Sequence, residues 1–246
     1  MNSILLRGIL VTTEKNIRIY YTKAPVLIFG LLFPLFMFFA FYLGRNIELA
    51  IFVPGFIAMA LFFTSSSVGP LITPWEKQAG TYERLLSFPV NINTIVLGDL
   101  FAGALYGLII TLVVSVFLLP LVGLTAKAIL MPLVLVLGSL CFSGLGVLLA
   151  SPSVKSPANI MMFSSLIRFP LIFISGIFIP FSELNGIGMY LSYLSPLSYL
   201  VDAFNSVMAK EHILPLGIDL MMLIVFTALF VYMSCRLHKR NMMKGL

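Results

Sequence analysis

The sequence predicts an all-α polytopic membrane protein with six transmembrane helices. The chain has 246 residues, of which 60% are hydrophobic and only 10% are charged, and its mean hydropathy is +1.09. A soluble domain of this length needs a more charged surface. Six continuously apolar runs match the roughly 20 residues that a bilayer-spanning helix requires, and they lack the alternation typical of membrane strands. The runs are 25–44, 50–73, 92–119, 129–150, 157–180 and 216–236.

The distribution of positive charge predicts the orientation of these spans. Three basic residues, Arg45, Lys127 and Lys210, fall on one side of the arrangement. Eleven fall on the other side: Arg7, Lys15, Arg18, Lys23, Lys77, Arg84, Lys155, Arg236, Lys239, Arg240 and Lys244. Because cytoplasmic loops carry the excess of Lys and Arg, both chain ends are expected in the cytoplasm. Topology and attraction to anionic lipid then explain the net charge of +6, and no nucleic-acid partner is expected.

The segment before the first span, residues 2–22, is too polar to cross a membrane. Its apolar residues recur at helical spacing on one side, and its charged residues occupy another side. This pattern predicts an amphipathic helix that lies in the cytoplasmic membrane interface. Two interpretations of this helix remain open, a passive anchor for the first span or a contact with a partner.

The most unusual segment is 75–90, WEKQAGTYERLLSFPV, which separates the second span from the third. It is short and charged in a chain that is otherwise nearly all apolar. A spacing of four residues would place Glu76, Gly80 and Arg84 on one face of a helix and a cluster of Tyr and Leu on another. We therefore expect a short cytoplasmic helix on which something outside the membrane docks.

Small residues in the third and fourth spans are spaced for close helix packing. The third span carries Gly103-xxx-Gly107, and the fourth carries Ser139-xxx-Ser143 and Gly146-xxx-Ala150. Small side chains at this spacing let the backbones of neighbouring helices approach each other. They predict packing between helices rather than a chemical site.

The region 181–215, between the last two spans, is too polar and too interrupted to form a further span. It contains three tyrosines at helical or near-helical spacing, Tyr190, Tyr193 and Tyr199. Tyrosine is enriched at the depth of the lipid headgroups. We therefore expect short, half-buried helices at the external interface of the membrane.

Arg168 and Asp99 are ionisable residues that lie well inside predicted spans. Arg168 is near the middle of the fifth span, and Asp99 lies one to two turns into the third. Because an Arg at the bilayer centre costs roughly 2.5–3.5 kcal/mol, Arg168 is expected to face protein or water. It could pair with Asp99, reach water by snorkelling, or lie on a transport path. Arg168, Asp99 and Phe173 are our candidates for residues of such a path.

The sequence carries no recognisable catalytic or cofactor site. It has no GxxxxGK[ST] loop, so ATP binding by this chain is not expected. His212 and His238 are isolated and have no metal-ligand spacing to a second His, Cys or carboxylate. The hydroxyl cluster at 64–67 has no His or Lys base nearby in the sequence. We therefore expect a non-catalytic chain without a cofactor or a metal of its own.

Two segments carry a resemblance to a known family. Residues 76–90, EKQAGTYERLLSFPV, resemble the pattern E-x-x-x-GT-x-E-x-L-x-x-x-P of the ABC transmembrane type-2 family, the membrane subunits of ABC exporters. The positions that fit are Glu76, Gly80, Thr81, Glu83, Leu85 and Pro89. The segment FPLIFISGIFIPFSEL at 169–184, with LSPLSYLVDAF at 194–204, is similar to the family's passage from its fifth span into external helices.

The resemblance implies a mechanism and a set of partners. Two permease chains, identical or closely paralogous, would pair with two separate ABC ATP-binding subunits, which hold ATP and Mg. Segment 75–90 would be the coupling helix that sits in a cleft of the ATPase, with Arg84 beside the positions that fit the pattern. The chain would be one ABC transmembrane type-2 domain over 1–246 in the prokaryotic plasma (inner) membrane.

Alternatives remain open for the substrate and for the driving force. The Phe-rich first two spans fit export of a small hydrophobic or amphipathic molecule or a lipid, but lipid-facing packing explains them equally well. Export of a polysaccharide or glycolipid is the second choice. A stand-alone, ion-coupled secondary carrier is the alternative from another class, and Asp99 is our candidate for its titrating carboxylate.

Overall fold

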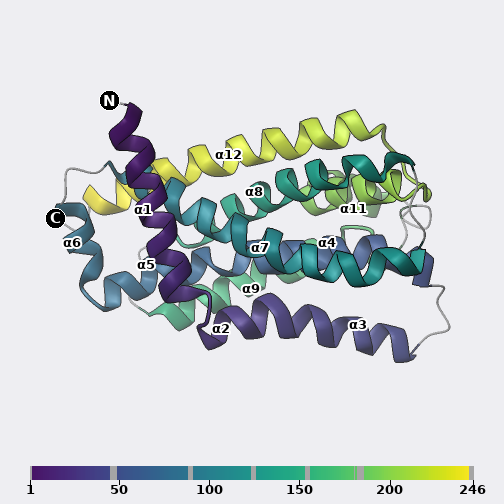
Figure 1. Ribbon diagram of the computed structural model, residues 1–246, viewed down its shortest axis with the longest axis horizontal. Helices are drawn as coiled ribbons and strands as arrows, with labels where there is room; N and C mark the ends of the chain where they lie inside the picture. The colour runs from purple at the N-terminus through teal and green to yellow at the C-terminus, as the bar shows by residue number, and fades with distance from the viewer. Residues whose placement is uncertain are drawn as a thin grey trace.

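The computed structural model describes residues 2–44, 49–87, 91–122, 126–152, 156–179, 181 and 186–243. These residues form helices and turns and contain no strand, which confirms the all-α fold class. Most of the long helices run along one axis of the molecule (Figure 1). Both chain ends lie at one end of the bundle, together with the short helix α6 (Thr81–Ser87).

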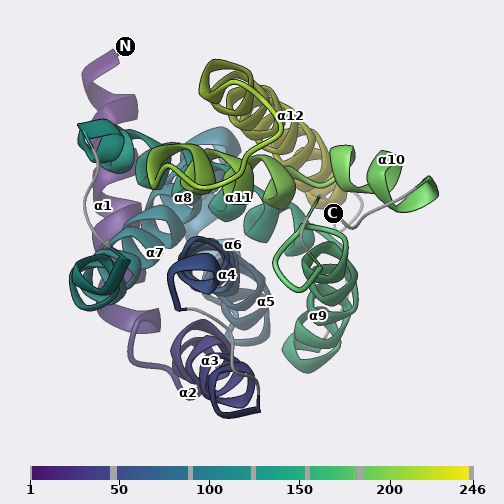
Figure 2. The ribbon, with the colours of Figure 1, turned by 90° about the vertical axis from the view of Figure 1, so that its right-hand side faces the viewer.

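The helix α4 (Leu49–Ser67) forms the centre of the bundle. It packs against α7 (Ile92–Val122), α8 (Met131–Leu149) and α11 (Pro196–Val207), and Figure 2 shows it surrounded by the other helices. The apolar stretch that contains α4 is 94% buried, compared with 11% for the stretch in α12 (Leu216–Met243). A helix that is apolar on all sides must be surrounded by other helices or by lipid. Other helices therefore surround α4, whereas α12 leaves most of its surface to lipid.

The chain enters the bundle through a sharp bend. The N-terminal helix α1 (Asn2–Tyr20) lies across one end of the bundle and packs against α7. It is bent by 89° relative to the helical run that follows, which contains α2 (Ala24–Leu27), a π-helical turn η1 (Ile28–Leu32) and α3 (Phe33–Gly44). Pro34 lacks a backbone N–H and its ring crowds the carbonyl of Gly30, which accounts for a widened turn at this position.

The hydrogen-bond ladder of the second span is interrupted between α4 and α5 (Gly69–Gln78). Pro70 lies at the start of α5 and has no backbone N–H to donate, but Val68 keeps helical backbone angles, so Phe52–Gln78 continues as one helical stretch. Two backbones come close together here, because a Cβ atom on Gly69 would lie 2.5 Å from the carbonyl carbon of Gly146 in α8. Glycine is therefore required at position 69, because any Cβ atom would clash with the backbone of α8.

The small residues of α7 serve the packing that the sequence predicts. A Cβ atom on Gly107 would lie 2.9 Å from the Cα atom of Ser65 in α4, and one on Gly103 would lie 3.0 Å from the carbonyl oxygen of Ser65. The Ser143 hydroxyl on α8 donates a hydrogen bond to the carbonyl of Leu100 on α7, at 2.5 Å. Small residues therefore let α4, α7 and α8 approach one another, as expected.

The predicted count of six spans is not confirmed. Within the described residues, four helical stretches are long and apolar enough to cross a membrane: Phe52–Gln78, Ile92–Pro120, Lys127–Leu149 and Leu216–Asn241. The third of them includes a 3-10 turn, η2 (Ala126–Leu130), before α8. A fifth results if α1 and the bent run after it count as one span. The helix α9 (Pro157–Phe173) is apolar but has only 17 residues, because the chain turns after Phe173 instead of continuing to residue 180.

Among its described residues, the region 181–215 contains two short helices, α10 (Ile187–Tyr193) and α11. The expectation that both are half-buried is wrong for α11, which is almost entirely buried against α4, α8 and α12. Tyr190 on α10 is exposed, but Tyr199 on α11 is buried and donates a hydrogen bond to the carbonyl of Tyr193, at 2.8 Å. The apolar residues of α11 pack against α4, α8 and α12, so this helix is part of the bundle core and does not lie on its surface.

Candidate functional site

Segment 75–90 consists of two helical pieces within its described residues. Trp75–Gln78 is the last turn of α5, and α6 follows after two residues. Gly80 has a positive φ of 67°, which favours glycine and ends α5 with a left-handed residue. The expected single face with Glu76, Gly80 and Arg84 is therefore wrong, because the helix axis changes direction at Gly80.

The helix α6 presents a free surface at the end of the bundle. Thr81 and Arg84 are exposed, and Leu85 is half-buried. Within the chain, α6 packs mainly against α5, where the Lys77 ammonium group lies 5.4 Å from the centroid of the Tyr82 ring. The side chain of Glu83 and all of Pro89 lie outside the described residues, so their predicted roles stay predictions.

Glu76 differs from the other predicted docking residues because it faces the interior. It is 3% exposed, and its carboxylate forms an ion pair with Lys15 on α1. The Thr81 hydroxyl, on the first residue of α6, donates a hydrogen bond to the carbonyl of Glu76, at 3.3 Å. Glu76 therefore connects α1, α5 and α6 and does not itself offer a surface to a partner.

Asp99 lies in a second polar contact of the same region. It is buried on α7 and accepts hydrogen bonds from the Asn16 amide on α1, at 2.7 Å, and from the Thr73 hydroxyl on α5, at 3.4 Å. The neighbouring Gly98 carbonyl accepts a hydrogen bond from Thr13, at 3.2 Å. Asp99 and the Lys15–Glu76 pair together join α1, α5 and α7, and we call this group the α1 junction.

Arg168 does not pair with Asp99, contrary to one of the expected arrangements. It is 1% exposed on α9, so snorkelling is also excluded. Its guanidinium donates to the hydroxyls of Ser67, at 3.1 Å, and Ser66, at 3.5 Å, where α4 ends, and its Nε donates to the carbonyl of Ser164, at 3.3 Å. The Phe63 ring lies 5.8 Å from its Cζ atom. Within the part of the chain that the structure describes, no carboxylate balances this charge.

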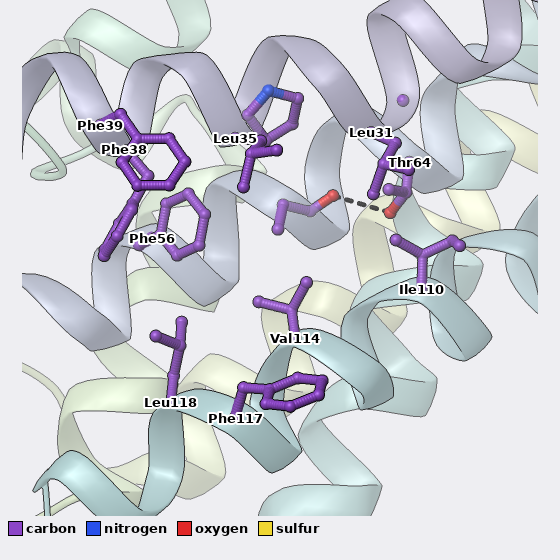
Figure 3. Close-up of a pocket in the computed structure, with 13 residues that line it drawn as sticks. Leu31, Leu35, Phe38, Phe39, Phe56, Thr64, Ile110, Val114, Phe117 and Leu118 are labelled. Carbon is purple, nitrogen blue, oxygen red and sulfur yellow. Dashed lines mark hydrogen bonds between the residues drawn. The ribbon is translucent and has the colours of Figure 1, made fainter.

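An apolar cavity of about 260 Å³ lies between the first span, α4 and α7. Its lining includes Phe38, Phe56 and Phe117; in Figure 3 Phe38 and Phe56 lie next to each other, and Phe117 lies apart from them, beside Val114 and Leu118. The Thr64 hydroxyl also lines it but donates its proton to the carbonyl of Ala60, at 2.7 Å. The cavity therefore offers an almost purely hydrophobic surface. Phe173, at the end of α9, is 59% exposed and is not among its lining residues.

The described residues contain no group of three or more His, Cys, Asp and Glu side chains that could hold a metal ion. Cys141 and Cys235 are free thiols. Of the two histidines, His212 is exposed and His238 is buried, with a ring nitrogen 3.2 Å from the carbonyl of Val147.

Sequence reasoning did not identify the partners of Glu76 and Asp99. Lys15, Asn16 and Thr73 are ordinary polar residues in the sequence, and no short-range spacing marks them. Lys15 and Glu76 are separated by 61 positions, and Asn16 and Asp99 by 83. The single available signal is the polar side of α1, which in the sequence fits a passive interfacial anchor and a contact with a partner equally well.

The match to protein families covers most of the bundle. Residues 8–209, from α1 to the end of α11, match the model of the family described as ABC-2 type transporter. No curated protein sequence matches the chain. The family match includes the α1 junction, the interrupted second span, α6 and the buried Arg168. The chain therefore belongs to the ABC-2 type transporter family and is a multi-pass membrane permease subunit of an ABC transporter.

Proposed function

We propose that this permease works in an ATP-driven exporter and that a separate ABC ATP-binding subunit docks on α6. A second permease chain, identical or closely paralogous, completes the assembly. ATP and Mg bind to the partner, and this chain turns the partner's movement into movement of its spans. The observation that carries the proposal is the exposed α6, which lies outside the bundle beside both chain ends.

The connections of α6 support a mechanical role. Only two residues separate it from α5, and the Thr81 hydroxyl ties its first turn to the carbonyl of Glu76. Through Glu76 the same point is joined to Lys15 on α1. A partner that displaces α6 therefore moves the end of the second span and α1 together, since the ion pair resists their separation. Arg84, Gly80, Thr81 and Leu85 are the residues that we assign to the docking surface.

Arg168 and the apolar cavity support an amphipathic cargo. A buried guanidinium without a carboxylate has unused capacity for an anionic group, and the cavity accommodates hydrocarbon. We therefore propose a small hydrophobic or amphipathic molecule or a lipid as cargo, with Arg168 and Phe173 on its path. The contacts of Asp99 favour a positioning role in the α1 junction over a place on that path.

Co-purification tests the docking assignment. A tagged chain, as wild type and as Arg84→Glu, is expressed together with an ABC ATP-binding subunit from the same organism. The matched control is Lys239→Glu, which reverses an exposed charge near the same end of the bundle, on α12. We expect the Arg84 variant to lose the ATPase and the Lys239 variant to retain it. An Arg84 variant that binds and stimulates the ATPase like wild type would overturn the assignment.

Reconstituted vesicles distinguish the proposal from an ion-coupled carrier. Purified permease without any ATP-binding subunit is expected to show no gradient-driven uptake, whether the gradient is of protons or of sodium. Transport under these conditions would establish the carrier instead.

A further inference from the structure

Two buried aspartates lie at the end of the bundle that is opposite to α6 and the chain ends. Asp202 is on α11, and Asp219 is in the first turn of α12. In Figure 1 both α11 and the beginning of α12 are at this far end, on the right. Both side chains line one small cavity. Neither residue belongs to the docking surface or to the proposed path.

Asp202 is a well-bonded carboxylate. It is 3% exposed, and it accepts hydrogen bonds from the backbone N–H groups of Ile213, at 2.9 and 3.2 Å, and of Leu214, at 2.8 Å. These hydrogen bonds to Asp202 hold the connection between α11 and α12 in place.

Asp219 has no such support. It is fully buried, at 0% exposure, and neither of its carboxylate oxygens has a hydrogen-bond partner among the described residues. An unpaired carboxylate that is removed from water is costly, and the nearby carboxylate of Asp202 makes its ionised form costlier still. Among the described residues, no Lys, Arg or His lines the cavity to balance the pair.

The cavity has room for a single small ion or water molecule. Its volume is about 10 Å³, which is near the space that a single water molecule needs. Ser192 and Tyr199 are also lining residues, and their hydroxyls donate their protons to the carbonyls of Met189 and Tyr193, at 2.7 and 2.8 Å. Each hydroxyl has a single proton, which is already donated, so its oxygen can only accept a hydrogen bond or coordinate a cation.

We propose that Asp219 and Asp202 bind one divalent cation of the calcium type at this end of the bundle, with the neighbouring hydroxyl oxygens completing its shell. A charge of +2 balances the two carboxylates, and a site with oxygen ligands alone suits a hard cation. The bound ion ties α11 to the first turn of α12. With only two carboxylates, the expected affinity for Ca²⁺ is weak, roughly 10⁻⁴–10⁻³ M.

Terbium luminescence tests the site on the full chain in detergent. Tb³⁺ substitutes for Ca²⁺, and Tyr193 and Tyr199 line the cavity closely enough to sensitise its emission. The variants are Asp219→Asn, which keeps the shape of the side chain, and Glu211→Gln, which removes an exposed charge from the connection between α11 and α12. We expect wild type and the Glu211 variant to give emission that CaCl₂ displaces, and the Asp219 variant to bind at least tenfold more weakly.

Thermal unfolding of the same samples in CaCl₂ or EDTA gives the second readout. Calcium is expected to raise the melting temperature of wild type and of the Glu211 variant, but not that of the Asp219 variant. Displaceable emission of equal strength in wild type and in the Asp219 variant would overturn the proposal. So would a wild-type melting temperature that is insensitive to calcium together with a higher one for the Asp219 variant, since Asp219 would then be a buried, protonated acid.

Discussion

The ion pair between Lys15 and Glu76 gives the most informative stability prediction. The side chain of Lys15 is 24% exposed and that of Glu76 is 4% exposed, so the two partners differ in their access to water. Replacing Lys15 with Met leaves a buried carboxylate without its counter-charge. Replacing Glu76 with Gln leaves a lysine that still reaches solvent. The two single variants should therefore differ in stability although they break the same pair.

The expected magnitudes follow from this asymmetry. Removing one partner of a buried ion pair costs about 3–5 kcal/mol, and the partial exposure of Lys15 lowers the expected cost of Lys15→Met to about 2–3 kcal/mol. Glu76→Gln should cost about 1 kcal/mol, since exposed pairs contribute little. The double variant contains neither charge and should lie within about 1 kcal/mol of wild type. The coupling free energy of the pair is then about 2 kcal/mol or more.

A double-mutant cycle on the unfolding free energy, measured by SDS titration in mixed micelles, provides the assay. The pair formed by Glu14 and Arg18 is the matched control, because it lies on the same helix and its side chains are 62% and 76% exposed. Its coupling should be within about 0.5 kcal/mol of zero. Additive costs for Lys15 and Glu76, or a coupling no larger than that of the control pair, would refute the α1 junction as a stabilising contact.

Three further variants probe other parts of the bundle. Gly107→Ala forces a Cβ atom against α4 and should destabilise by about 1–3 kcal/mol in the same titration, whereas Gly217→Ala, which meets open space, should not. Asp202→Asn should speed hydrogen exchange at the backbone amides of Ile213 and Leu214, which donate hydrogen bonds to this carboxylate; unchanged protection of these amides would contradict its anchoring role. Arg168→Met removes a buried charge that has no carboxylate partner, so unfolding stability should stay the same or rise while transport by the assembled exporter is lost; normal transport would remove Arg168 from the path.

The sequence predicted the fold class because hydropathy and length depend on short-range composition alone. The interruption between α4 and α5 and the change of helix direction at Gly80 were also predictable in principle, since Gly69–Pro70 and the residues around Gly80 are ordinary signals for helix ends. The single helix expected at 75–90 is wrong because Gly80 adopts a left-handed backbone conformation that ends α5, in spite of the four-residue spacing of the side chains around it.

The α1 junction was beyond the reach of pattern analysis. The bend of 89° after α1 turns part of its polar side toward α5 and α7, where Lys15 and Asn16 find their partners. In a membrane interface the same polar side would face water, so amphipathicity alone does not distinguish the two environments. The burial of Asp219 depends on the packing of α11 onto α12, and no short-range pattern in the sequence indicates this contact.

Site-specific cross-linking in native membranes tests the central claim most directly. A cysteine at Arg84 on α6 and one at Lys210, between α11 and α12 at the other end, are each treated with a short bifunctional reagent in membranes that contain the ATP-binding subunit. We predict a cross-link to that subunit from position 84 and none from position 210. A cross-link from position 210, or its absence from position 84 when the intact complex is present, would contradict docking on α6.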